Sequence, residues 1–129
     1  MPLVTAQAKC LPTESPSKVA KAVLNIFPDS RVEQSEEGIV ARSSSLERFK
    51  ELIRNYRILD TTRSVLLAGR SGSTTSFSIN KQVAFVGKIS FVEERMPLGS
   101  IDVTFEDEDI ESLIDGVAPV TVNGEEVLK

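Results

Sequence analysis

The order in which two hydrophobic periodicities alternate along this chain limits the folds that it can adopt. Apolar and polar residues alternate over residues 3–11, which is typical of a strand with one buried face. Ser15 and Pro16 then supply an N-cap hydroxyl and a proline at the first helical position. An apolar stripe at helical spacing follows and predicts an amphipathic helix that ends at Pro28. The stripe consists of Val19, Val23, Leu24 and Phe27.

A hairpin and two helices are expected next. Residues 32–41 predict the hairpin, because two short strand patterns flank a polar turn that ends at Gly38. Ser44 and Glu47 have the spacing of a capping box, which predicts the start of a second helix. Its apolar positions are Leu46, Phe49, Leu52, Ile53 and Tyr56. A further helix is expected over residues 59–68, capped by the glycine that follows.

Three strands and a last helix are predicted in the C-terminal half. Residues 70–73 form a turn before them, and residues 80–82 link the first two as either a turn or one helical turn. A short acidic helix is expected over residues 107–115. The three strands are expected at residues 75–79, 85–92 and 101–105.

Together these elements predict a single α+β domain over residues 1–119, followed by a C-terminal tail over residues 120–129. A chain of 129 residues is one domain by length, and it is large enough to bury about two-thirds of its unfolded surface. We expect a mixed or mostly antiparallel sheet that is covered by helices on one face.

Charges of opposite sign are segregated along the chain. Residues 42–88 contain nine basic and three acidic residues, a balance of +6, whereas residues 89–129 contain two basic and eleven acidic residues, a balance of −9. The net charge of −4 for the whole chain hides this contrast. Segregation of this strength creates local electrostatic fields. It predicts a face that binds a polyanion, or a face that pairs with an acidic surface.

Several classes of function are disfavoured by what the sequence lacks. The chain has no histidine, which removes the commonest general base, the Ser-His and Cys-His nucleophile pairs and most zinc sites. We therefore expect no enzyme, no catalytic residues and no cofactor. The acidic residues between 106 and 111 lack the order of a calcium loop, so no metal site is expected there. One cysteine, Cys10, cannot form an internal disulfide, which fits a reducing cytoplasm. No apolar run approaches the roughly 18–20 residues of a membrane span, so no membrane partner is expected.

RNA is the polyanion that we expect the basic segment to bind. Guanidinium groups are permanently charged and bind phosphate bidentately, and amide side chains read base edges or 2′-hydroxyls, although they also stabilise turns. Because the chain has no Trp and one Tyr, contacts to phosphates and to RNA shape are expected rather than base stacking. The candidate RNA contacts are Arg48, Arg54, Arg57, Arg63, Arg70, Lys81, Gln82 and Lys88.

A different explanation of the same charges is a protein-interaction module or a homodimer. In that hypothesis the basic residues 42–88 of one copy face the acidic residues 93–115 of a second copy or of a partner protein. Charged helix faces are also ordinary in soluble proteins, and acids three residues away can neutralise some of the bases. Glu47 with Lys50 and Glu51 with Arg54 have this spacing.

Five segments of the chain resemble a small archaeal protein family over about residues 3–119. They are residues 12–16 (PTESP), 22–28 (AVLNIFP), 45–49 (SLERF), 57–60 (RILD) and 80–88 (NKQVAFVGK). Members of that family are similar in fold to the fifth protein of the large ribosomal subunit, an α+β domain that binds ribosomal RNA. The family also resembles an exosome-associated, RNA-binding group. The resemblance implies an RNA-binding α+β domain, and it implies no catalytic residues.

Overall fold

A computed structural model of the chain describes residues 2–36, 38–92, 99–122 and 125–126. Six strands form one sheet in the order β2-β3-β1-β6-β5-β4, and every neighbouring pair is antiparallel. The sheet is therefore antiparallel throughout, which narrows the prediction of a mixed or mostly antiparallel sheet. Its strands are β1 (Leu3–Lys9), β2 (Arg31–Ser35), β3 (Gly38–Ser43), β4 (Arg70–Ser71), β5 (Thr74–Asn80) and β6 (Ser100–Glu106).

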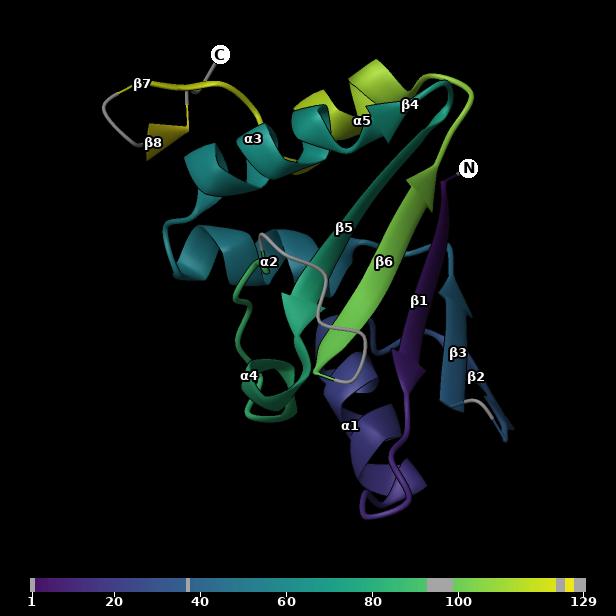
Figure 1. Cartoon of the computed structure of the whole chain (residues 1–129). Coiled ribbons are helices and arrows are strands. Elements are labelled where there is room, and N and C mark those ends of the chain that lie inside the picture. Colours follow the sequence, from purple (N-terminus) through teal and green to yellow (C-terminus); the bar gives the residue numbers. More distant parts are fainter. Residues whose placement is uncertain (1, 37, 93–98, 123–124, 127–129) are drawn as a thin grey trace.

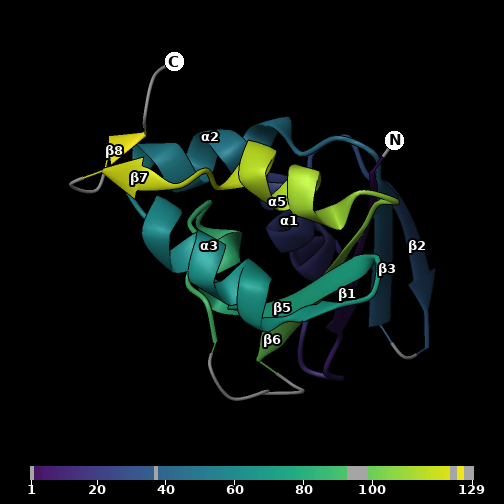
Figure 2. The same ribbon diagram turned by 90° about the horizontal axis from the view of Figure 1, so that it is seen from above.

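Five helices lie in the described part of the chain, and they cover one face of this sheet (Figures 1 and 2). Among the described residues, none of these helices has the length and apolar character needed to cross a membrane. The α+β class and the one-sided cover of helices are as predicted from the sequence. The helices are α1 (Pro16–Ile26), α2 (Glu47–Asn55), α3 (Leu59–Ala68), α4 (Lys81–Phe85) and α5 (Ile110–Val117).

A cluster of four phenylalanine rings joins the helices to the sheet. Phe27 and Phe49 stack with their centroids 5.8 Å apart, and Phe105 of β6 meets both rings edge-on. Phe77 of β5 extends the cluster, with its centroid 5.2 Å from that of Phe105. Burying one such ring contributes about 1.5–3 kcal/mol, so this cluster is a major part of the core.

The hairpin of β2 and β3 is confirmed, with Ser35 opposite Gly38. Gly38 has a φ of +144°, and a Cβ atom placed on it would lie 2.3 Å from the carbonyl oxygen of Ala8 in β1. A glycine is thus required here by close contact with the neighbouring strand as well as by backbone conformation.

The helix that was predicted from Ser44 begins three residues later. Leu46 is the N-cap of α2 and no side chain caps this end, so the capping box between Ser44 and Glu47 is not formed. The two predicted helices are separate, because α2 ends at Asn55, α3 begins at Leu59, and Arg57 between them has a φ of +55°.

The strand predicted over residues 85–92 is wrong. Asn80 accepts a hydrogen bond from the backbone N–H of Val83 at 3.0 Å and so caps a short helix, α4, which ends at Phe85. This is the helical alternative for residues 80–82. Of the predicted strand, Phe91 alone keeps a single β-bridge, to Ile79. The local cap therefore explains why Phe85 lies in a helix and not in the predicted strand.

Three short strands were not expected from the sequence. Residues 70–73 form more than a turn, because Arg70 and Ser71 pair with β5 as the edge strand β4. In the predicted tail, β7 (Thr121–Val122) pairs with β8 (Glu125–Glu126) as a second, two-stranded sheet. Residues 123–124 between these strands lie outside the described residues. The boundary at residue 119 stays a prediction.

Candidate nucleic-acid interface

The arginines of α3 and β4 are paired with acids of α5. Arg63 donates a hydrogen bond to Asp115 at 2.8 Å, and Arg70 forms an ion pair with Glu111. The basic and acidic segments that were separated in sequence therefore meet inside one chain. Figure 2 shows α3 and α5 running side by side above the sheet. These two charges are partly neutralised before any external anion arrives.

Two arginines also hold the C-terminal end of α5 through backbone carbonyls. Arg54 donates to the carbonyl oxygen of Val117 at 3.2 Å and to that of Lys50 at 3.1 Å. Arg63 donates to the carbonyl oxygen of Ala118 at 3.1 Å. Cations at this position suit the negative end of the helix dipole and satisfy carbonyls that have no intrahelical partner. Both side chains thus have a structural role, apart from any contact with RNA.

The remaining candidates on α2 and after it differ in how they are placed. Arg48 pairs with Glu51, one turn further along the same helix. The expected pair of Glu47 and Lys50 is present at 3.9 Å, and the pair expected between Glu51 and Arg54 stays a prediction. Arg57 is exposed at the break between α2 and α3.

Lys81 lies inside the protein, although it was a candidate RNA contact. Its side chain is 6 % exposed, and its Nζ donates to Oε1 of Glu14 at 2.8 Å and to the carbonyl oxygen of Lys9 at 2.9 Å. The same Oε1 atom accepts the backbone N–H of Leu11 at 3.0 Å. Burial raises the pKa of Glu14, but the hydrogen bonds from Lys81 and Leu11 and the charge of Lys81 together lower that pKa below its ordinary value. Glu14 is therefore held as a carboxylate.

Gln82 and Lys88, the last two candidates, are exposed at either end of α4. Gln82 also lines a pocket between α4 and the start of α1. The eight candidate residues are thus distributed over several surfaces. Their direct contact with RNA stays a prediction.

The surface where α1 meets α4 has features that the sequence did not reveal. Asn25 of α1 donates to the carbonyl oxygens of Ala84 and Phe85 at 3.0 Å and 2.9 Å, which fixes α4 against α1. The Nζ atom of Lys21 lies 5.2 Å from the centre of the Phe85 ring, a cation–π contact. Lys18 is exposed one turn before Lys21. We call Lys18, Lys21, Gln82 and Phe85 the α1–α4 surface.

The sequence contains a pattern that indicates this surface, but the stronger positive charge of residues 42–88 drew the prediction away from it. Lys18 and Lys21 stand three residues apart, which places them on one side of a helix. They lie outside the strongly basic segment, in a part of the chain that has no excess of positive charge. Phe85 was included in the strand predicted over residues 85–92, whereas it lies on α4 and is 36 % exposed.

The open face of the sheet is polar and lacks aromatic side chains at the outward positions of the described strands. Gln7, Ser78, Asp102 and Thr104 are among its residues, and Ser78 donates to Asp102 at 2.7 Å. Sheets that bind single-stranded RNA stack its bases on aromatic rings, which are missing here. The two exposed aromatic residues in the described part of the chain are Tyr56, which follows α2 as its C-cap, and Phe85 on α4.

The acids at the start of α5 behave as a helix cap. Asp109 accepts hydrogen bonds from the backbone N–H and the hydroxyl of Ser112, at 3.2 Å and 2.8 Å, and these bonds lower its pKa. This agrees with the predicted helix N-terminus, which begins at Ile110 rather than at residue 107. Among the described residues, no group of acids and cysteine is arranged to hold a metal ion.

Comparison with known proteins identifies a matching family model and several related proteins. A family model described as RNA binding matches residues 3–106. A UPF0201 protein of Sulfurisphaera tokodaii is 38 % identical over 133 residues, which cover 96 % of this chain and 92 % of that protein. A UPF0200/UPF0201 protein of Archaeoglobus fulgidus is 46 % identical over 127 residues. This alignment covers 96 % of the present chain but 39 % of the Archaeoglobus protein, which is therefore much longer.

Solved structures agree with this relationship. The crystal structure of a UPF0201 protein from Methanococcus jannaschii has a TM-score of 0.87 at 36 % identity, covering 98 % of this chain and 99 % of that one. A second UPF0201 crystal structure has the same TM-score at 44 % identity, covering 97 % and 99 %. A DUF54 protein of Archaeoglobus fulgidus, at 20 % identity, shares the fold with a TM-score of 0.65 and covers 92 % of this chain and 97 % of its own. On the family model and on these relatives, the chain belongs to the UPF0201 family and to the family that is described as RNA binding.

Proposed function

We propose that this protein binds RNA through phosphate contacts centred on the α1–α4 surface, and that it catalyses no reaction. The family model described as RNA binding supports the ligand class. The observation that carries the location is the placement of Lys21 over the exposed ring of Phe85, with Lys18 one turn away. Cations beside an exposed aromatic ring are the usual composition of a single-stranded nucleic-acid contact.

Basic residues elsewhere are less available for phosphate than Lys18 and Lys21, which supports this location. Arg63 and Arg70 would have to leave Asp115 and Glu111 before they could bind phosphate fully. Lys18 and Lys21 are exposed on α1, and neither has to leave an acid of the α1–α4 surface before it binds phosphate. Arg57 and Lys88 are exposed and remain part of the proposed contact set.

Three more specific predictions from the sequence are part of this proposal. A fold similar to the fifth protein of the large ribosomal subunit, a relationship to an exosome-associated group and a cytoplasmic location all fit an RNA-binding protein. A non-catalytic role is supported by the absence of histidine from the sequence. A protein partner that uses the charged surfaces is the alternative that the following experiment distinguishes.

Fluorescence anisotropy with a hairpin RNA across a salt series tests the proposal. Lys18→Glu with Lys21→Glu should weaken binding at least tenfold and reduce the slope of log affinity against log salt by about 1.4–1.8, as expected for two lost phosphate contacts. Arg31→Glu with Arg42→Glu is the matched control, since both arginines are exposed on strands β2 and β3 and the change in net charge is the same. Equal losses in the two double variants would reject this location, and an absence of RNA binding by the wild type would reject the function.

A further inference from the structure

The pocket between α4 and the N-terminal part of α1 is open to solvent and has a volume of about 370 Å³. Pockets that bind small organic groups have about 300–1,000 Å³, so this one has room for a single planar ring system and its substituents. It adjoins the α1–α4 surface, because Lys18, Gln82 and Phe85 belong to both.

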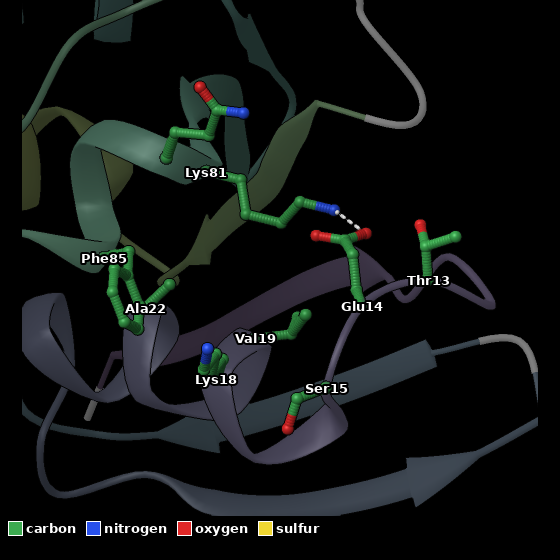
Figure 3. Close-up of a pocket in the computed structure, with 9 residues that line it drawn as sticks. Thr13, Glu14, Ser15, Lys18, Val19, Ala22, Lys81 and Phe85 are labelled. Carbon is green, nitrogen blue, oxygen red and sulfur yellow. Dashed lines mark hydrogen bonds and ion pairs between the residues drawn. The ribbon is translucent and has the colours of Figure 1, made fainter.

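One side of the pocket is apolar. Val19 and Ala22 of α1 are buried and supply aliphatic groups, and Phe85 supplies an aromatic ring that is 36 % exposed. Figure 3 shows Phe85 beside Ala22, with Val19 between them and the polar side. The hydrogen bonds from Asn25 hold the backbone at Phe85 in place, so the ring is part of a preformed wall. A flat, partly exposed ring of this kind is suited to stacking.

The opposite side carries a fixed carboxylate. Glu14 and Lys81 meet there, as the dashed line in Figure 3 marks. Oε1 of Glu14 accepts hydrogen bonds from both Lys81 and the N–H of Leu11, and these bonds fix the orientation of the whole group. A carboxylate has acceptor capacity on both oxygens, so Oε2 can accept a donor from a molecule in the pocket. The side chain of Glu14 is 28 % exposed, which leaves it accessible.

We propose that this pocket receives the base of one unpaired RNA nucleotide, which stacks on Phe85 and donates its exocyclic amino group to Glu14. Lys18 and Lys21 on α1 then lie close enough to the pocket mouth to contact the phosphates on either side of that nucleotide. This inference rests on the proposed function and adds to it a class of RNA, one with a bulged or looped-out base. It differs from the expectation that phosphate contacts and RNA shape, rather than base stacking, account for binding.

The chemistry of Glu14 gives the pocket a base preference. Adenine, cytosine and guanine each present an exocyclic amino group, whereas the Watson–Crick edge of uracil has two carbonyl oxygens around its single N–H. A carboxylate accepts from amino groups and is repelled by carbonyl oxygens. A stacked uracil can reach Glu14 only with that N–H, and the carbonyl oxygens on either side of it weaken the contact. A bulged uridine should therefore bind less tightly than a bulged adenosine.

Three hairpin RNAs that differ at one position test the inference: fully paired, with one bulged adenosine, and with one bulged uridine. Anisotropy titrations with the full chain should show the adenosine bulge bound about tenfold more tightly than the paired hairpin, in line with one base–aromatic stack. Phe85→Ala should abolish this difference, and Phe85→Leu should reduce it. Val86→Ala is the matched control, because Val86 is 66 % exposed next to Phe85 and does not line the pocket, and it should keep the full difference.

The outcomes separate this inference from the proposed function. Equal wild-type affinity for all three hairpins, with binding still sensitive to Lys18→Glu and Lys21→Glu, overturns the base pocket and leaves RNA binding intact. A preference that survives in Phe85→Leu at full strength overturns the stacking role. Absence of binding to every hairpin overturns the proposed function and the base pocket together.

Discussion

Lys81 Nζ lies 2.8 Å from Glu14 Oε1, and this ion pair joins the first residue of α4 to the loop before α1 across 67 positions of the sequence. The two partners are unequally buried, with side chains 6 % and 28 % exposed. The pair therefore fixes one wall of the proposed base pocket, and its two ends should respond differently to substitution.

Glu14→Gln should destabilise the protein more than Lys81→Met does. The first change leaves a lysine charge buried without its counter-ion, which costs about 3–5 kcal/mol in unfolding free energy. The second leaves a carboxylate that can still reach water, so we expect a loss of about 1–2 kcal/mol. Urea unfolding of the two variants and of the double variant measures this. A larger loss in Lys81→Met, or strictly additive losses, would contradict the unequal burial.

The same pair predicts how stability changes with acid. The pKa of Glu14 is lower in the folded protein than its ordinary value of 4.5, so the unfolded state binds the proton more tightly. This stabilisation is fully present above pH 4.5 and is lost as the pH falls through the folded-state pKa. Glu14→Gln should flatten that part of the pH profile of unfolding free energy. Asp109→Asn is a useful control, because Asp109 has a lowered pKa for a separate local reason, its bonds from Ser112. If the wild-type pH dependence persists in Glu14→Gln and disappears in Asp109→Asn, the stabilisation comes from Asp109 and the prediction for Glu14 is wrong.

Substituting Arg63 should lower the free energy of unfolding, whereas substituting Arg57 should leave it almost unchanged. Arg63→Met removes the ion pair to Asp115 and the hydrogen bond to the carbonyl of Ala118, and its side chain is 24 % exposed. We expect about 1.5–3 kcal/mol of lost unfolding free energy, since hydrogen bonds that involve charged groups contribute about this much. Arg57→Met changes an exposed side chain and should have an effect within about 0.5 kcal/mol. Chemical denaturation decides this, and similar losses in the two variants would refute the structural role of Arg63.

Charge segregation along the sequence could not reveal which charges face one another. Arg63 and Asp115 are 52 residues apart, and no local pattern indicates that α3 and α5 become neighbours. The sequence predicted a basic face because it counted Arg63 and Arg70 as unpaired. The fold brings the acidic helix onto that face, so the net charge of a segment was a poor guide to the charge of a surface.

Periodicity located most of the sheet and α1 correctly, because those segments are long enough to show it. The strands at Leu3–Lys9 and Ser100–Glu106 alternate over seven residues each. The strand predicted over residues 85–92 overlaps α4 at Phe85, and a short apolar run there does not distinguish strand from helix; the cap from Asn80 starts the helix instead. Since Phe85 lies in that run, the same ambiguity hid the aromatic wall of the proposed pocket.

Replacing Gly69 or Gly116 by alanine should change the unfolding free energy in opposite directions. A Cβ atom on Gly69 would lie 2.0 Å from the carbonyl oxygen of Ser76, in backbone that cannot move without disturbing the β4–β5 hairpin. Gly69→Ala should therefore lower the unfolding free energy by about 2 kcal/mol or more. A Cβ atom on Gly116, within α5, meets no atom within 4 Å, and alanine is favoured over glycine in a helix by about 0.8–1 kcal/mol. Thermal or urea unfolding of the two variants checks this, and a stabilising effect of Gly69→Ala would show that the contact with Ser76 is looser than the structure describes.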